Sequence, residues 1–204
     1  MSVPELPLHC SDRNPDEEWR TVLRLSGILF AVSVAVTGVV SRWFDVPVFE
    51  EARSVHVDAV AGLVVSCPLL VGLVLLRQSR GLLARKLWDV PTDLLGPALS
   101  RSTRTGLAAI ALMAGVGEEV LFRGLLQNWL EPAGLPVALI IPNVLFGLLH
   151  YVNAVYAVAA GATGLYFSIL VHFVPGVSLY SLIVAHAFYD YVALNCLAAR
   201  VRRH

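Results

Sequence analysis

The chain has 204 residues, of which 57% are hydrophobic and only 15% are charged. A soluble globular domain carries roughly 25% charged residues, so this composition argues against an ordinary soluble domain and indicates a polytopic membrane protein. Fifteen basic residues balance fifteen acidic ones, and the resulting net charge of zero predicts no nucleic-acid partner.

The first 20 residues are polar and acidic, and they lack the basic start and short apolar core of a cleavable signal peptide. We expect residues 1–20 to be a solvated cytoplasmic tail. Cys10 falls in this tail, whereas Cys67 and Cys196 fall in apolar runs. Three scattered cysteines predict neither a disulfide framework nor a thiolate metal site.

Six apolar segments follow, each close to the ~20 residues that cross ~30 Å of hydrocarbon, although the fourth is short. They are residues 22–40, 57–76, 105–130, 136–150, 154–174 and 177–199. The sequence therefore predicts an all-α polytopic membrane protein with about six transmembrane helices. Residues 21–76 would hold the first two of these helices, and residues 105–199 the last four.

The distribution of basic residues predicts the orientation in the membrane. Residues 77–104 contain six Lys and Arg against two Asp, and the tail 200–204 adds three Arg. Basic residues accumulate on the cytoplasmic side. We therefore expect a multi-pass protein of the inner cell membrane, with both termini cytoplasmic. Residues 77–104 either lie flat on the membrane surface as an amphipathic segment or form a solvated loop.

Charged side chains in the middle of a bilayer cost several kcal/mol unless they are paired or hydrated, which makes them candidates for function. They are Glu118, Glu119, Arg123, His150, His186 and Asp190. All lie in the last four apolar segments. A rise of ~1.5 Å per residue places Glu118, His150 and His186 about 9 to 21 Å from the inner face, which permits one shared site.

Helical spacing sorts these charged residues. Glu119 and Arg123 are four residues apart with the acid first, the order that favours an ion pair. Glu118 is turned by about 100° from Glu119, so we expect Arg123 to neutralise Glu119 and to leave Glu118 free. His186 and Asp190 are also four apart, and a carboxylate at this spacing can fix the tautomer of an imidazole.

Neighbouring residues have more ordinary explanations. Phe146 shares a helical face with His150 and is expected to support it. Asn143 could face the same cavity, although a place at a helix start after Pro142 is the more ordinary role. Small residues recur along the fifth segment at a spacing typical of close helix packing: Ala157, Ala160, Gly161 and Gly164.

Three stretches together resemble a known family. EEVLFRG resembles the EExxxR motif, FGLLH the FxxxH motif and HAFYD the HxxxN/D motif of the CAAX-protease and bacteriocin-processing (CPBP) family. These proteins are intramembrane endopeptidases related to the type II CAAX prenyl endopeptidases. The order and spacing of all three motifs match, and the resemblance covers about residues 100 to 198. Residues 105–199 would thus form a CPBP-like protease core.

The resemblance implies a mechanism of peptide-bond hydrolysis. Glu118 would activate a water molecule for attack on the scissile carbonyl, and His150 would help to hold and deprotonate that water. His186 and the residue at position 190 would stabilise the oxyanion, while Glu119 and Arg123 would brace the site. Asp190 replaces the Asn of other members, and an ionised carboxylate cannot donate a hydrogen bond. Either Asp190 is protonated, or it orients His186, which then stabilises the oxyanion alone.

The site also raises the question of a metal. Glu118, His150 and His186 have the composition of a His₂Glu zinc site with an open position, and the family has been described as metalloprotease. The sequence has no HExxH helix, however, and the resemblance to glutamate-based prenyl endopeptidases favours a metal-free water. We therefore expect no cofactor, with zinc at these three residues as the alternative.

The leading functional hypothesis is an intramembrane endopeptidase that cleaves a membrane-associated or exported peptide or protein. The substrate would be a peptide precursor, a bacteriocin or pheromone, a prenylated C-terminus, or a C-terminal sorting signal. The alternatives are a non-catalytic immunity or scaffold protein that retains the fold, and a small transporter with a proton relay. Intact Glu118, His150 and His186 argue against the scaffold, and the lack of an inverted repeat argues against the transporter.

Overall fold

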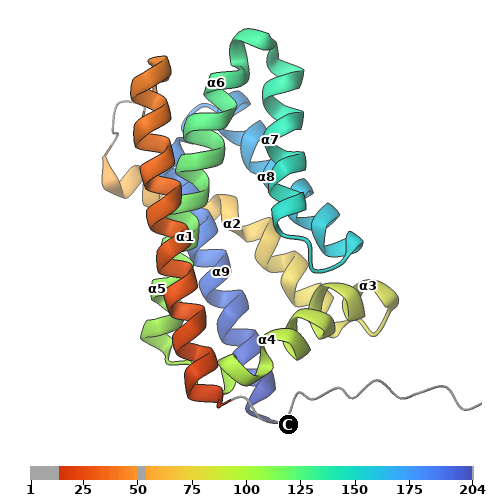
Figure 1. Ribbon diagram of the computed structural model, residues 1–204. Coiled ribbons are helices and arrows are strands. Elements are labelled where there is room, and N and C mark those ends of the chain that lie inside the picture. The colour runs from red at the N-terminus through yellow and green to blue at the C-terminus, as the bar shows by residue number, and fades with distance from the viewer. Residues whose placement is uncertain (1–13, 50–53, 204) are drawn as a thin grey trace, which may run out of the picture.

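The computed structural model describes residues 14–49 and 54–203, and all regular structure in these ranges is helical (Figure 1). The elements are α1 (Pro15–Phe44), α2 (Val55–Gln78), α3 (Leu82–Ala84), η1 (Arg85–Asp89), α4 (Val90–Ser100), α5 (Arg104–Glu119), η2 (Val120–Gln127), α6 (Asn128–Leu130), η3 (Glu131–Ala133), α7 (Leu135–Leu149), α8 (Ala154–Phe173) and α9 (Leu179–Val201). Most of the expected N-terminal tail, with Cys10, lies outside the described residues.

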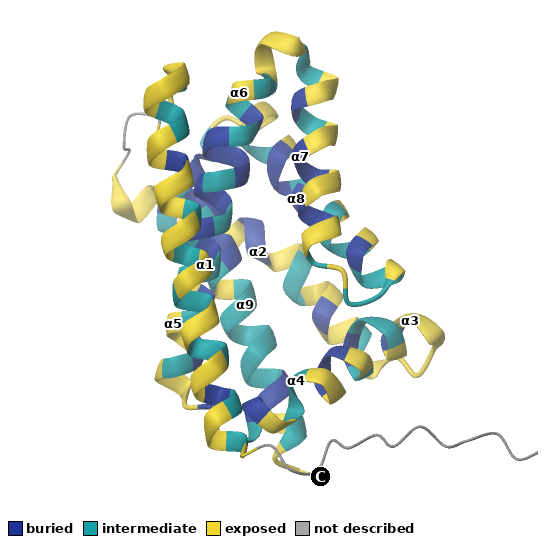
Figure 2. Ribbon diagram, in the orientation of Figure 1, coloured by how far each residue is buried: buried dark blue, intermediate teal, exposed yellow. Residues whose placement is uncertain are grey.

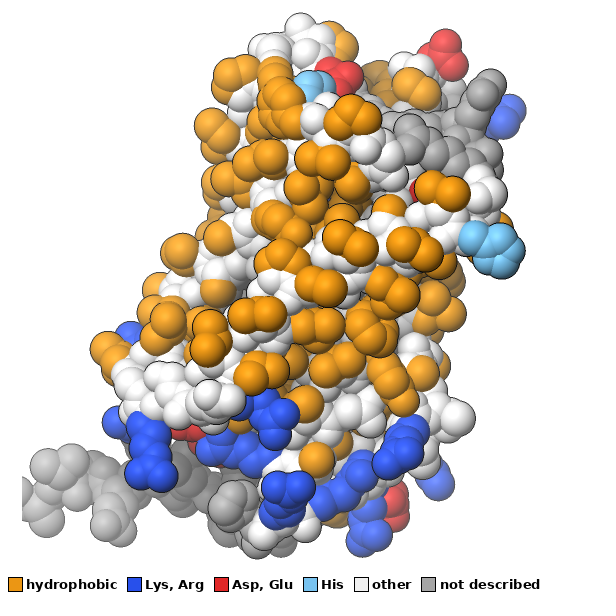
Figure 3. Space-filling view, turned by 180° about the vertical axis from the view of Figure 1, so that it is seen from behind, with side chains coloured by type: hydrophobic (Ala, Val, Ile, Leu, Met, Phe, Trp, Pro, Cys, Tyr) orange, Lys and Arg blue, Asp and Glu red, His pale blue; other side chains and the backbone are white. Residues whose placement is uncertain are grey.

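The prediction of an all-α polytopic membrane protein is confirmed. Five helical runs in the described ranges are long and apolar enough to cross a membrane: Pro15–Phe44, Val55–Gln78, Arg104–Ala133, Ala154–Phe173 and Leu179–Val201. The remaining predicted segment is the shorter apolar helix α7. Apolar side chains cover the middle of the face seen in Figure 3, as a surface in contact with lipid requires. The outer face of α1 is exposed along its length (Figure 2).

Four long helices form the body of the molecule. Helix α9 packs against α5 and α2, and α1 packs against α5 (Figure 1). Two glycines allow α9 to come close to both neighbours. A Cβ on Gly115 of α5 would lie 2.9 Å from the backbone nitrogen of Ala187, and one on Gly62 of α2 would lie 2.6 Å from the carbonyl oxygen of Ser181. The backbones of α5 and α9, which carry four of the candidate site residues, are therefore closely apposed.

Helices α7 and α8 form an antiparallel hairpin beside this body, and each packs chiefly on the other (Figure 1). A Cβ on Gly147 would lie 2.5 Å from the carbonyl oxygen of Ala157 and 3.2 Å from the backbone of Gly161. The small residues of α8 thus take part in close helix packing, as their spacing indicates. The turn of the hairpin is tied to η1, because Asn153 Nδ2 donates a 2.9 Å hydrogen bond to the carbonyl of Lys86.

Residues 82–100 form α3, η1 and α4, which close one end of the molecule. Trp88 and Leu99 of this segment are buried in a cluster with Trp19 of α1, Leu73 of α2 and Leu197 of α9. The sequence predicted either an amphipathic surface segment or a solvated loop for residues 77–104. The structure shows that residues 82–100 are helical and packed against the transmembrane helices. Lys and Arg side chains gather at this end of the molecule (Figure 3).

Replacing Gly147 by Ala tests the packing of the hairpin. The added methyl group would collide with the backbone of α8, and we expect the free energy of unfolding to fall by about 1–3 kcal/mol, as for other overpacked sites. Thermal unfolding in detergent measures this loss. Gly72→Ala is the matched control, since nothing lies within 4 Å of a Cβ at that exposed position of α2. Equal unfolding temperatures for the two variants would contradict the expectation.

Candidate active site

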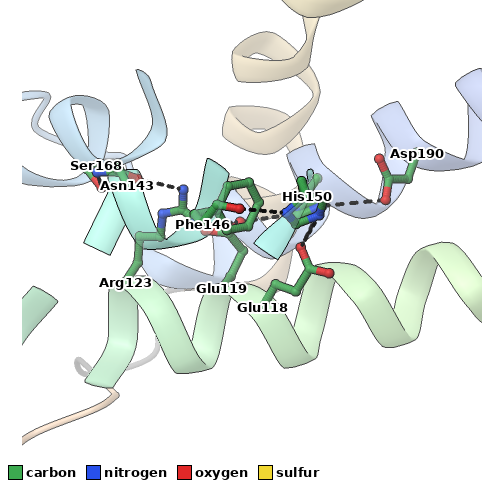
Figure 4. A network of polar contacts seen from close by, with 9 residues as sticks. Glu118, Glu119, Arg123, Asn143, Phe146, His150, Ser168 and Asp190 are labelled. Atoms are coloured by element: carbon green, nitrogen blue, oxygen red, sulfur yellow. Dashed lines mark hydrogen bonds and ion pairs between the residues drawn. The ribbon is translucent and has the colours of Figure 1, made fainter. Parts of the chain in front are cut away.

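Two adjacent acids end α5 and have different surroundings. The side chain of Glu119 is fully buried, whereas that of Glu118 is 28% exposed. Both carboxylates lie close to residues of α7 and α9 (Figure 4). The helix then continues directly into η2, a stretch of π-helix, and such turns are frequent at functional sites. The offset of about 100° between neighbours on a helix thus gives the two acids different partners.

Arg123 is the centre of a buried polar network. Its Nη1 donates a 3.1 Å hydrogen bond to Glu119 Oε1, so the ion pair expected from the spacing is present. Its Nη2 donates a 3.1 Å hydrogen bond to Asn143 Oδ1, and the guanidinium lies 4.7 Å from the centre of the Phe146 ring. Asn143 Nδ2 in turn donates to Ser168 Oγ at 2.8 Å. The arginine therefore joins η2 to α7 and α8.

The assignment of Asn143 to a helix start is wrong. Helix α7 begins at Leu135, so Pro142 and Asn143 lie in its interior, and Asn143 is buried. An interior proline is tolerated in a membrane helix because neighbouring groups satisfy the freed backbone carbonyls. Ser168 gives no signal in the sequence, since a single serine in an apolar helix usually bonds to its own backbone. Only the packing of α8 on α7 shows that it receives a hydrogen bond from Asn143.

His186 is held by an acid from another helix. Its Nδ1 lies 2.7 Å from Glu119 Oε1, and because a carboxylate only accepts, this nitrogen carries the proton. The other ring nitrogen, Nε2, lies 3.4 Å from Asp190 Oδ2 and 3.8 Å from Glu118 Oε2. The spacing of four residues does bring Asp190 next to the imidazole. The short bond at Nδ1, however, is made by Glu119.

His150 follows α7 as its C-cap and has a defined tautomer in its neutral form. Its Nδ1 lies 2.8 Å from the carbonyl oxygen of Phe146, which can only accept, so Nδ1 is the donor. In the neutral ring, Nε2 then keeps its lone pair, and it lies 3.6 Å from Glu118 Oε2. The imidazole also packs on the Phe146 ring at 4.4 Å between centroids. Phe146 therefore orients His150 through both its backbone and its ring.

Glu118 has a carboxylate oxygen that the described residues do not bond. Its Oε2 is buried and accepts no hydrogen bond from the described residues, although the Nε2 atoms of His150 and His186 lie 3.6 and 3.8 Å away. Glu119 Oε2 is also buried without a partner, but the other oxygen of that acid accepts two hydrogen bonds. The structure thus brings together all the charged residues that the sequence singles out, with Phe146 among them (Figure 4).

A cavity of about 310 Å³ adjoins His150, His186 and Asp190, and its volume is within the size range of small-ligand sites. One part of its wall is formed by His150, His186 and Asp190, together with Phe146 and Tyr156. Most of the remaining wall is apolar and comes from α2, η1, α4 and α9: Leu73, Leu76, Leu87, Trp88, Pro91, Leu95, Ala193, Leu194 and Leu197. The sequence did not single out Tyr156, since only the turn between α7 and α8 brings it to the site.

The zinc alternative concerns Glu118, His150 and His186. No group of three or more His, Cys, Asp or Glu among the described residues is arranged to hold a metal ion. The Nδ1 atoms of His150 and His186 are already bonded to Phe146 and Glu119. Their Nε2 atoms lie 3.6 and 3.8 Å from Glu118 Oε2, and no step of the reaction proposed below is assigned to a metal.

The two acids should respond differently to neutralisation. Glu119→Gln removes the charge that pairs with Arg123 and His186, and breaking a buried pair of this kind costs about 3–5 kcal/mol. We expect a marked fall in the yield of folded, monodisperse protein, measured by size-exclusion chromatography. Glu118→Gln should give the wild-type yield, since no described group donates a hydrogen bond to its buried oxygen. Equal losses in both variants would refute this difference.

The comparison with known proteins agrees with the three motifs. Residues 101–192 match the family model described as type II CAAX prenyl endopeptidase Rce1-like. No curated protein and no solved structure matches the chain. The matched range begins just before α5 and ends in α9 just after Asp190, so it contains every candidate site residue. This part of the chain is therefore similar to the Rce1-like family of type II CAAX prenyl endopeptidases.

Proposed function

We propose that the protein is an intramembrane endopeptidase that hydrolyses a peptide bond with a water molecule activated by Glu118. One observation carries this proposal: of two adjacent acids, Glu119 is bonded through Oε1 to Arg123 and His186, whereas Glu118 turns its buried Oε2, which accepts no hydrogen bond from the described residues, toward two imidazoles. The family match supports a peptide hydrolase. A structural role alone would not require an acid without a hydrogen-bond partner in a membrane interior.

The activation step follows from the acceptors at the site. A water molecule that lies ~3 Å from both Glu118 Oε2 and His150 Nε2 would donate its two hydrogens to these two atoms. As the water oxygen attacks the scissile carbonyl, Glu118 takes one proton. It then returns that proton to the nitrogen of the leaving amine when the C–N bond breaks, while the other hydrogen stays with the new carboxyl group. Atoms and charge balance without another reactant.

His186 would stabilise the oxyanion that forms during attack. Its Nδ1–H is bonded to Glu119, and Arg123 holds Glu119 in place. In its protonated form His186 also presents Nε2–H beside Glu118 and Asp190, where the substrate carbonyl would lie. Three carboxylates surround this ring: those of Glu118, Glu119 and Asp190. A donor fixed in this way needs no rearrangement during the reaction.

The substrate class is proposed from the cavity and its surroundings. Its apolar walls fit a substrate with apolar groups beside the scissile bond, in a membrane-associated or exported peptide or protein. A peptide precursor, a bacteriocin or pheromone, a prenylated C-terminus and a C-terminal sorting signal all meet this requirement. The concentration of Lys and Arg at one end supports an orientation with that end, and the chain termini, on the cytoplasmic side of the inner membrane.

A cleavage assay with purified protein in liposomes tests the proposal. Two sets of internally quenched peptides would be offered, one with a prenylated CAAX-type C-terminus and one with an unmodified apolar C-terminus. We expect the wild type to cleave members of at least one set, and Glu118→Gln to be slower by about a thousandfold while it remains folded. Glu131→Gln, which neutralises a half-exposed acid outside the cavity, is the matched control. Cleavage by Glu118→Gln within tenfold of the wild type would refute the assignment.

Metal dependence is tested separately. Because the proposed reaction uses only Glu118 and the two histidines, we expect activity to persist after 1,10-phenanthroline treatment and gel filtration into metal-free buffer. The rate of peptide cleavage before and after treatment is the measurement. A loss of activity that added Zn²⁺ restores would show that the metal-free assignment is wrong.

A further inference from the structure

We infer that Tyr156 is a further catalytic residue, whose phenolic hydroxyl donates a hydrogen bond to the oxyanion. This inference rests on the proposed function. Tyr156 lies in the first turn of α8 and lines the same cavity as His150, His186 and Asp190. Tyr156 is half-buried, and a tyrosine combines an apolar ring with a hydroxyl that can donate a hydrogen bond.

The residues of the three sequence motifs leave the oxyanion with one donor. The Nδ1–H of His186 is committed to Glu119, so only Nε2–H can reach the substrate. Asp190 lies 3.4 Å from that nitrogen, and an ionised carboxylate cannot donate and would repel a developing negative charge. Oxyanion sites for acyl transfer commonly supply two donors. A neutral donor on the cavity side of Asp190 would complete the site.

Tyr156 is the cavity hydroxyl that follows the turn next to His150. It lines the cavity together with His150 and Asp190. It therefore shares a wall with the imidazole that would hold the water and with the residue beside which the second donor is needed. Thr163 is seven residues further along α8, about 10 Å away along the helix axis. The other cavity phenol is Tyr189, which lies on α9.

The turn between α7 and α8 positions Tyr156 together with His150. Asn153 is the N-cap of α8, and its Oδ1 accepts a 3.0 Å hydrogen bond from the backbone N–H of Tyr156. Its Nδ2 donates to the carbonyl of Lys86 in η1 at 2.9 Å. His150, three residues before Asn153, is fixed at the end of α7. The anchored turn between α7 and α8 thus fixes the positions of both His150, which would hold the water, and Tyr156.

The first test is Tyr156→Phe, which keeps the ring and removes the hydroxyl. With a quenched peptide that the wild type cleaves in liposomes, we expect kcat to fall by about a hundredfold, as for the loss of one oxyanion donor, while KM changes less than threefold. Tyr166→Phe is the matched control on the same helix, because that hydroxyl donates a 2.9 Å hydrogen bond to the carbonyl of Val65 outside the cavity. The control should lower the unfolding temperature and keep kcat within threefold of the wild type.

A second measurement separates donation from a structural role. Asp190→Asn places a neutral amide donor beside the proposed oxyanion, so adding Tyr156→Phe in that background should reduce kcat less than fivefold further. A phosphinate analogue of the same peptide carries a fixed negative oxygen in place of the oxyanion, and Tyr156→Phe should weaken its inhibition by the same factor as kcat/KM. An equal loss in both backgrounds, with unchanged phosphinate inhibition, would show that Tyr156 acts only on the fold.

Two outcomes overturn the inference while the proposed function stands. One is a Tyr156→Phe variant that keeps kcat within threefold of the wild type. The other is the expected loss of kcat in Tyr189→Phe in place of Tyr156→Phe, which would assign the donor to the other phenol. The proposed function is decided independently by Glu118→Gln, since it needs that acid whichever group binds the oxyanion.

Discussion

The Oε1 atom of Glu119 receives two hydrogen bonds, and the rest of the site depends on them. Arg123 reaches it from the next turn of the same helix, and His186 reaches it from α9. A buried carboxylate is tolerated in a membrane interior only when such partners compensate the loss of water. The same oxygen therefore keeps an arginine charge in the core and fixes the orientation of an imidazole on another helix.

The two adjacent acids therefore have different contacts. Glu119 is bonded through Oε1 to Arg123 and His186, and Glu118 faces two imidazoles with a buried oxygen that accepts no hydrogen bond from the described residues. The network extends beyond the acids, because Arg123 also binds Asn143 and thereby orders α7 behind Phe146. A chain of contacts thus runs from α9 through α5 to the hairpin. Residues that would not touch the substrate therefore set the position of the Glu118 side chain.

The sequence predicted the helices well because transmembrane segments are long, apolar and bounded by polar residues. Residues 154–174 and 177–199 were expected, for example, and α8 and α9 are Ala154–Phe173 and Leu179–Val201. The contact between Glu119 and Arg123 was predictable because it is made within one helix. Contacts between helices were not predictable from the sequence. The hydrogen bond from His186 to Glu119 and the position of Tyr156 in the cavity wall both depend on how closely the helices pack. Gly115 permits the first of these approaches, and its sequence context alone does not show which helix it faces.

The length of α7 has a consequence for the surrounding bilayer. Fifteen residues of helix span only about 22 Å, less than the ~30 Å of hydrocarbon, so α7 alone cannot connect the two membrane surfaces. With Leu135 at one surface, the turn at His150 would lie inside the hydrocarbon layer. Backbone groups at that depth must be satisfied by protein or by water that penetrates the lipid. A helix shorter than the layer it occupies thins the membrane locally and draws the aqueous boundary inward. The hydrophobic mismatch of one helix would thus bring water, the second reactant of hydrolysis, to the carboxylate that is proposed to use it.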